Sequence, residues 1–168
     1  MNNRCIYFVE GQCEELLVKA LKEEPAKLIA GKVKVLNPIQ NRIPNSILNM
    51  ISSGMTVVLV YDTDKPETEI LLRNIELLKK FCDKIRLIHL MQVQSLEDEL
   101  VRCTDVKEAK NLTKSASKKD FKADFCKLSP QSCRQLLERH HLHAEVLWST
   151  PAPEPFDKII RNRELAKA

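Results

Sequence analysis

The sequence predicts an α/β fold in which a four-stranded, mainly parallel sheet lies between two layers of helices and is followed by a helical extension. Over the first 103 residues, short apolar segments alternate with amphipathic helical patterns. This alternation is typical of parallel strands joined by right-handed crossovers. From residue 104 the chain turns polar and basic. We therefore expect an α/β domain over residues 1–103 and a basic, mainly helical extension over residues 104–168 that packs on the same domain.

Four segments have the composition of strands. The strongest is TVVLVYD, residues 56–62, in which five consecutive apolar or aromatic residues indicate a central strand buried on both faces. RCIYFV, residues 4–9, also has the character of a buried strand. KVKVL (32–36) and KIRLIHLM (84–91) complete the sheet, and AEVLW (144–148) is a candidate for a short additional strand.

Helical patterns fill the intervals between these strands. The first begins after Gly11 and ends at Pro25, because proline disrupts a helix interior. Pro44 opens a short helix that Gly54 is expected to close. Pro66 suits the first turn of a longer helix. We expect helices over residues 12–24, 44–54, 66–82, 95–103 and 130–142.

Composition excludes several classes of protein. Only three residues are glycine, which argues against a Gly-rich dinucleotide-binding loop. The six cysteines are never two or three positions apart, so zinc-ribbon and thioredoxin-type motifs are absent. No apolar stretch approaches the roughly 18 residues of a membrane span, and no signal-peptide pattern precedes the first strand. We therefore expect a cytoplasmic protein with reduced thiols and no membrane partner.

Positive charge is concentrated in the extension. The net charge is +4, and between Lys107 and Arg139 nine Lys or Arg residues stand against four Asp or Glu residues. This asymmetry is compatible with a surface that binds phosphate groups. A solvated helical surface explains any single lysine of the segment equally well.

Acidic residues follow two strands that we expect to be neighbours. Glu10 ends the first predicted strand, Asp62 ends the third, and Asp64 lies two residues further on. In an open parallel sheet, sites form at the carboxyl ends of the strands. Two carboxylates about 6.5 Å apart repel by roughly 2.5 kcal/mol at an effective dielectric constant of about 20. The acids therefore favour a bound proton or a cation, and oxygen ligands suit Mg²⁺ or Mn²⁺.

Structural roles stay open for each of these acids taken alone. Asp64 is well placed to cap a helix that begins at Pro66. Glu10 suits an exposed loop before the first helix. The expectation of a shared site depends on both acids lying at the ends of adjacent strands.

Two motifs of the chain resemble those of the Toprim family. YFVEGQCEELLVKAL, residues 7–21, is similar to the first Toprim motif: a hydrophobic strand, a glutamate, a glycine and an amphipathic helix. VVLVYDTD, residues 57–64, is similar to the second, a DxD motif that ends a hydrophobic strand. The resemblance covers roughly residues 4–103 and implies a three-layer, Rossmann-like Toprim domain. Toprim domains occur in topoisomerases, primases, small ribonucleases and overcoming-lysogenization-defect nucleases. The chain resembles the last two groups most.

The resemblance implies roles for the strand-end acids. Glu10 would match the family's glutamate, which is a metal ligand or a general acid/base. Asp62 and Asp64 would match the family's metal ligands. We therefore expect Glu10 and Asp62 to be catalytic and all three acids to bind the metal.

An acidic segment, SLEDEL, follows the fourth predicted strand. It resembles the segment that supplies a further metal ligand in the nuclease branch of the family, with Glu97 as the first candidate and Asp98 as the second. The alternative is structural, because Ser95 and Asp98 have the spacing of a near capping box. Acids also favour the first turn of a helix for reasons of the helix dipole.

Within the Toprim family, the residues of this chain favour hydrolysis. Its two tyrosines, Tyr7 and Tyr61, lie inside predicted strands and are badly placed to attack a phosphate. The leading hypothesis is therefore a nuclease, in which Mg²⁺ or Mn²⁺ polarises a phosphodiester of DNA or RNA and activates a water molecule. We expect phosphate contacts from basic residues after the DxD motif and in the extension: Lys65, Lys118, Lys119 and Lys122.

Two other functions stay open. The chain could be a non-catalytic Toprim-like module that binds nucleic acid or a protein, as a homo-oligomer or as a subunit of a larger complex. A flavodoxin- or receiver-like domain would instead use Asp62 for phosphate or ligand chemistry. The later threonine or serine and the lysine of a receiver are not found in order. A cation bound between Glu10 and Asp62 separates these hypotheses.

Overall fold

The computed structural model contains a four-stranded sheet in which every neighbouring pair of strands is parallel. The structure describes residues 4–23, 28–82 and 84–159. The strands, in their order across the sheet, are β2 (Lys32–Val35), β1 (Cys5–Val9), β3 (Thr56–Asp62) and β4 (Arg86–Gln92). The predicted α/β class is therefore confirmed, with a sheet that is parallel throughout the described residues.

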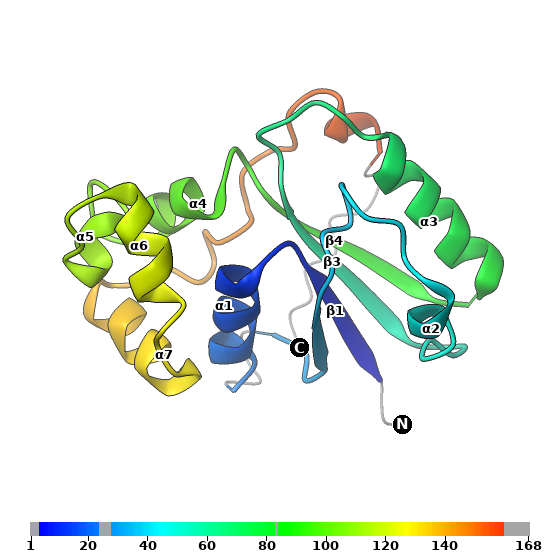
Figure 1. Ribbon diagram of the computed structural model, residues 1–168, viewed down its shortest axis with the longest axis horizontal. Coiled ribbons are helices and arrows are strands. Elements are labelled where there is room, and N and C mark those ends of the chain that lie inside the picture. Colours follow the sequence, from blue (N-terminus) through cyan, green and yellow to red (C-terminus); the bar gives the residue numbers. More distant parts are fainter. Residues whose placement is uncertain (1–3, 24–27, 83, 160–168) are drawn as a thin grey trace.

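Helices cover both faces of this sheet (Figure 1). Successive residues of a strand point to opposite faces, so β3 contributes to two cores. Val58 and Val60 pack with residues of α1, α4 and α7, whereas Val57 and Leu59 pack with residues of α2 and α3. These helices are α1 (Gln12–Lys22), α2 (Asn45–Leu48), α3 (Glu69–Phe81), α4 (Leu96–Cys103) and α7 (Pro130–Arg139).

The extension contributes to both cores. Besides α7 it forms α5 (Lys110–Thr113), α6 (Lys118–Phe125) and the short 3₁₀ helix η1 (Phe156–Lys158). Phe121 and Phe125 of α6 are fully buried in the core shared with α1, and Phe156 of η1 is buried in the core shared with α3. In Figure 1, α5, α6 and α7 gather beside α1, and the chain then passes to η1 near α3.

The register of the sheet brings the two predicted acidic strand ends together. β1 and β3 are adjacent, with Val9 paired to Val60. Asp62 is paired to Gln92 of β4. Because the strands are parallel, their carboxyl ends meet at one edge of the sheet. Glu10 and Asp62 therefore leave the sheet side by side.

Three local expectations are wrong. Residues 144–148 form turns instead of a strand, and Trp148 has a left-handed φ of 59° that an extended strand does not allow. The helix α2 ends at Leu48, and Gly54 with its φ of 80° serves the turn before β3 instead. The helix α3 begins at Glu69 with Thr68 as its N-cap residue, so Pro66 precedes the helix.

None of the helices in the described part of the chain is both long enough and apolar enough to span a bilayer.

Candidate metal centre

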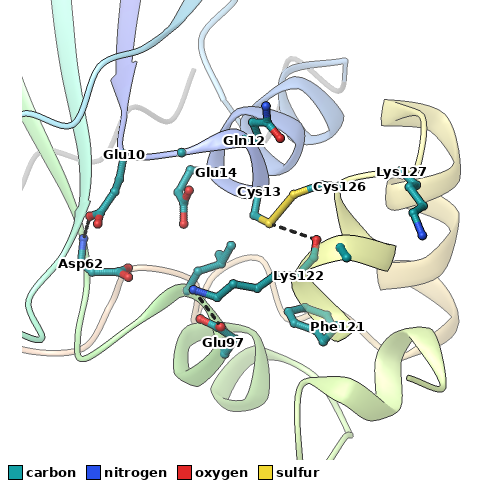
Figure 2. Close-up of a pocket in the computed structure, with 13 residues that line it drawn as sticks. Glu10, Gln12, Cys13, Glu14, Asp62, Glu97, Phe121, Lys122, Cys126 and Lys127 are labelled. Carbon is teal, nitrogen blue, oxygen red and sulfur yellow. Dashed lines mark hydrogen bonds and ion pairs between the residues drawn. A yellow bond between two sulfur atoms is a disulfide. The ribbon is translucent and has the colours of Figure 1, made fainter. Parts of the chain in front are cut away.

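A cavity of about 580 Å³ opens at the carboxyl ends of β1 and β3. Its walls come from the start of α1, the end of β3, the first turn of α4 and one face of α6 (Figure 2). The charged residues that carry the argument are four carboxylates, Glu10, Glu14, Asp62 and Glu97, and one lysine, Lys122. The cavity therefore combines a strongly acidic wall with a basic helix.

Glu10 continues the sheet for one residue beyond β1. Its backbone N–H donates to the carbonyl oxygen of Val60 over 3.2 Å. Its side chain bends toward β3, where Oε2 accepts a hydrogen bond from the backbone N–H of Asp62 over 3.0 Å (Figure 2). The Glu10 carboxylate thus contacts the backbone of Asp62, while the Asp62 carboxyl group is directed into the cavity (Figure 2).

Asp62 carries the most perturbed carboxylate of the cavity. Burial raises the pKa of Asp62 from its ordinary value of 3.8 to about 8, and the negative charges of Glu10, Glu14, Glu97 and Asp64 add to the rise. Its Oδ1 atom is buried and has no hydrogen-bond partner among the described residues. Without a cation, this carboxyl group retains a proton at neutral pH.

Glu14 is a site residue that the sequence analysis missed. It lies in the first turn of α1, lines the cavity and is only 7% exposed. Burial raises the pKa of Glu14, and the charges of Glu10 and Glu97 raise it further. The sequence offered one indication of this role, because Glu14 lies only four residues after Glu10. Acids are common in first turns, so that signal alone did not separate Glu14 from a surface residue.

Gly11 allows Glu14 to approach the strand end. A Cβ atom at Gly11 would lie 3.0 Å from Oε2 of Glu14. That distance is shorter than an ordinary carbon–oxygen contact, so the flexible end of the Glu14 side chain would have to shift by a few tenths of an ångström.

Glu97 and Asp98 have different roles although they are neighbours. Ser95 is the N-cap residue of α4, and its hydroxyl accepts from the backbone N–H of Asp98 and donates to the Asp98 carboxylate. Asp98 therefore serves the exposed helix cap. Glu97 turns into the cavity and is 4% exposed, which makes it the candidate ligand of this segment.

Lys122 supplies the positive charge in the cavity. Its Nζ lies 3.2 Å from Oε1 of Glu97 in an ion pair, and neither carboxylate oxygen of Glu97 has a hydrogen-bond partner among the described residues. Partial burial acts to lower the pKa of Lys122, but Glu97, Asp62 and Glu14 outweigh it and the pKa is raised. The ammonium group therefore stays charged and partly neutralises the acidic wall.

Other predicted site residues lie outside this cavity. Asp64 and Lys65 are exposed and do not line it, although the charge of Asp64 acts on Asp62. Lys118 lines a smaller neighbouring cavity of about 210 Å³ that shares Glu97 as a wall. Lys119 is exposed near the start of α6. Four predicted residues therefore line the cavity: Glu10, Asp62, Glu97 and Lys122. The other four lie outside it: Asp64, Lys65, Lys118 and Lys119.

The donor set fits a hard divalent cation. Six buried side-chain polar atoms in the described part of the chain lack a hydrogen-bond partner, and five of them belong to Asp62, Gln92 and Glu97. Gln92 is fully buried and is paired with Asp62 in the register of β3 and β4, whereas Glu97 lines the same cavity as Asp62 from the first turn of α4. Buried polar atoms without partners are costly, and carboxylate and amide oxygens are ligands that Mg²⁺ and Mn²⁺ accept.

The side chains as they stand do not yet form a cage. Within the described residues, no three His, Cys, Asp or Glu side chains are placed to share one ion. The cause is visible in two contacts, because Glu10 is bonded to the Asp62 backbone and Glu97 is paired with Lys122. Binding a cation therefore requires rotamer changes of Glu10 and Glu97 and the departure of Lys122.

The expectation that all thiols are reduced is wrong at two cysteines. Cys13 of α1 and Cys126 at the end of α6 form a disulfide whose Cα atoms are 5.3 Å apart, and both residues line the cavity. They lie 113 positions apart in the sequence. The cysteine spacing could not reveal this pair, because it depends on how the extension folds back onto α1.

Comparisons of the chain with models of protein families, with curated proteins and with solved structures found no match. The resemblance of the two motifs to those of Toprim domains is therefore an expectation from the sequence alone.

Proposed function

We propose that this chain is a Toprim-type, metal-dependent phosphodiesterase that hydrolyses DNA or RNA. The observation that carries the proposal is the gathering of Glu10, Glu14, Asp62 and Glu97 around one cavity at the carboxyl ends of neighbouring parallel strands. Three of these four side chains are buried or carry buried, unpartnered oxygens. Such a group is stable only with bound protons or with a cation.

The balance of charge supports a cation. Four ionised carboxylates carry four negative charges, and Lys122 neutralises one of them. The raised pKa values of Asp62 and Glu14 mean that protons supply part of the remaining neutralisation. A divalent cation replaces those protons and also satisfies the unpartnered oxygens of Asp62 and Glu97.

The proposed roles follow from the positions of the side chains. Asp62, Glu10, Glu97 and Glu14 would hold Mg²⁺ or Mn²⁺, which when bound polarises a phosphodiester and lowers the pKa of a water molecule. Glu10 lies at the solvent side of the strand end and could instead transfer a proton to or from the reacting oxygen. Asp64 stays a proposed ligand at the edge of the site.

The basic residues of α6 would contact the substrate backbone. Lys122 reaches into the cavity and is free to contact a phosphate oxygen once a cation has taken Glu97. Lys118 and Lys119 are exposed near the start of the same helix, and Lys65 is exposed after the DxD motif. Together they would give an electrostatic, sequence-independent attraction for nucleic acid.

A second candidate function is a non-catalytic module that binds nucleic acid or a protein. The observation that favours it is the ion pair between Lys122 and Glu97, which closes the acidic wall without any metal. In that case the carboxylates would be a structural feature, and binding would survive their neutralisation.

The deciding experiment combines metal binding with a cleavage panel. Mn²⁺ binding is measured by electron paramagnetic resonance for the wild type, Asp62→Asn, Glu97→Gln and Asp98→Asn. Cleavage of single- and double-stranded DNA and RNA is measured with Mg²⁺ and with Mn²⁺. We expect Asp62→Asn to abolish Mn²⁺ binding and cleavage, and Glu97→Gln to weaken both. Asp98→Asn should leave Mn²⁺ binding and cleavage unchanged. Cleavage that is absent in the folded wild type, with nucleic-acid binding that persists in Asp62→Asn, supports the module instead.

A further inference from the structure

We propose that Cys13 and Cys126 form a redox switch that controls entry of a divalent cation into the acidic cavity. In the disulfide form, α6 is fixed to α1 and Lys122 is held against Glu97. In the dithiol form, Lys122 leaves Glu97 more easily and the cavity binds the cation more tightly. The inference rests on the proposed metal site and adds its regulation.

The disulfide is part of the cavity wall and touches the helix segment that carries Lys122. Cys13 lies three residues after Glu10, and Cys126 ends α6 (Figure 2). The Sγ atom of Cys13 lies 3.6 Å from the carbonyl oxygen of Lys122. Lys122 and Cys126 are four residues apart in the same helix, so their side chains lie on one face. Fixing Cys126 to α1 therefore also fixes the face that presents Lys122.

Lys122 and a divalent cation compete for the same carboxylate. Lys122 contacts Glu97 directly, whereas Lys127, the second lysine that lines the cavity, pairs with Asp124 over 3.2 Å. The disulfide restricts the last turn of α6, so the face that carries Lys122 loses less conformational freedom when the ion pair forms than it would without the tether. The disulfide therefore strengthens the Lys122–Glu97 pair and weakens cation binding.

Three of the other four described cysteines are unsuited to redox chemistry, and the fourth lies away from the cavity. Cys5, Cys103 and Cys133 are buried, and burial raises the pKa of their thiols to about 11, about 12 and about 12. Buried thiols of this kind are inert, because the thiolate is the reactive form. Cys82 follows α3, which packs on the opposite face of the sheet. Among the described cysteines, Cys13 and Cys126 are thus the pair that lines the cavity of the proposed site.

Opening the disulfide leaves α6 attached to the protein. Phe121 and Phe125 are fully buried and anchor the helix in the core. A dithiol reductant transfers two electrons and two protons, the Sγ–Sγ bond breaks to give two thiols, and the reductant closes into its own disulfide. The change is reversible, and it alters the freedom of the Lys122 face without unfolding the domain.

The switch is tested by Mn²⁺ titrations of the oxidised and the reduced protein, with free Mn²⁺ measured by electron paramagnetic resonance after the dithiol has been removed under anaerobic conditions. Reduction is expected to lower the Kd for Mn²⁺ by about fivefold or more. Cys126→Ser is expected to bind Mn²⁺ with the Kd of the reduced wild type, and dithiol treatment should not change that Kd. Cys82→Ser, the matched control, is expected to keep the wild-type response.

Two further measurements separate the possible failures. Lys122→Met keeps the unbranched, apolar part of the side chain and removes the competing charge, so its oxidised form is expected to bind Mn²⁺ at least as tightly as the reduced wild type. Linkage requires that saturating Mn²⁺ also makes the disulfide easier to reduce at a fixed dithiol ratio. Equal Kd values for oxidised and reduced wild type would overturn the switch while leaving the metal site intact. No binding in any form, Lys122→Met included, would overturn both the switch and the metal site.

Discussion

The backbone N–H of Asp62 donates a hydrogen bond to Oε2 of Glu10 over 3.0 Å, which joins the ends of two strands that lie 52 residues apart in the sequence. This bond holds the Glu10 carboxylate against the backbone of Asp62. It also occupies an oxygen that a shared cation would use. The contact therefore makes the metal-free site compact and ties its opening to a rearrangement of Glu10.

Neutralising Asp62 is expected to stabilise the metal-free protein while abolishing Mn²⁺ binding. In Asp62→Asn, a group repelled by Glu10, Glu14 and Glu97 loses its charge. At about pH 8 we expect the free energy of unfolding to rise by about 1 kcal/mol. Chemical denaturation with and without Mn²⁺ measures both effects. Asp157→Asn, at an exposed position of η1, is the control, and a lower midpoint for Asp62→Asn without metal would contradict the expectation.

The stability of the metal-free protein is expected to fall as the pH rises. The folded-state pKa of Asp62, about 8, lies above its ordinary value of 3.8, so between these values the folded protein binds more protons than the unfolded chain. The stabilising contribution is thus complete below about pH 4 and is lost as the pH passes about 8. Denaturation at a series of pH values measures this trend, which Asp62→Asn should flatten.

Cation affinity is expected to change with pH in the opposite direction. Ligation requires the ionised carboxylate, so each bound Mn²⁺ displaces the proton of Asp62 below about pH 8. We expect the Kd for Mn²⁺ to fall steadily as the pH is raised toward that value, with proton release in weakly buffered solution. A Kd independent of pH over this interval would show that Asp62 takes no part in binding.

Glu14→Gln is expected to weaken Mn²⁺ binding by about tenfold or more, because a buried carboxylate of the cavity is lost. The matched control is Glu15→Gln, which removes a carboxylate from the next residue. Glu15 pairs with Lys19 over 2.7 Å on the outside of α1 and does not line the cavity. Equal titration curves for the two variants would remove Glu14 from the site.

Asn74→Ala is expected to destabilise the fold without touching the site. The fully buried amide of Asn74 donates to the carbonyl oxygens of Pro38 and Asn41 and accepts from the backbone N–H of Ile43, at 2.8 to 3.0 Å. Three backbone groups lose their partner in the variant, which should cost about 3 kcal/mol. Urea denaturation measures the loss, and the Kd for Mn²⁺ of the folded fraction should not change.

The fold could be predicted where local pattern and tertiary burial agree. The strand at residues 56–62 has the predicted bounds, because its apolar run is needed by cores on both faces of the sheet. The segment at residues 144–148 misled the prediction. Its Val146, Leu147 and Trp148 are apolar, but they lie in turns and pack into the core shared with α1, α4 and α7. Apolar composition alone does not distinguish a strand from a packed turn.

Part of the site could be predicted: the acids at the two strand ends, Glu97 in the first turn of α4, and Lys122 as a basic residue. Glu10 and Asp62 follow strands whose adjacency the alternating pattern implies. The role of Lys122 inside the cavity and the pairing of Cys13 with Cys126 depend on the path of the extension, which carries no periodic pattern strong enough to place it. Glu14 was missed for a different reason, since its burial arises from the wall that α6 builds opposite α1.

That wall has a consequence for anyone who wishes to shorten the protein. A fragment that stops at Cys103 would lose Phe121 and Phe125, so apolar surface on α1 and α4 would meet solvent. The fragment would also keep the four acids of the cavity but lose Lys122, whose ammonium group partly neutralises them. The minimal unit worth expressing is consequently the α/β domain together with α5, α6, α7 and the segment through η1, because Leu147, Trp148 and Phe156 are also buried in the two cores. A chimaera that exchanges α6 exchanges the counter-charge of the acidic pocket as well.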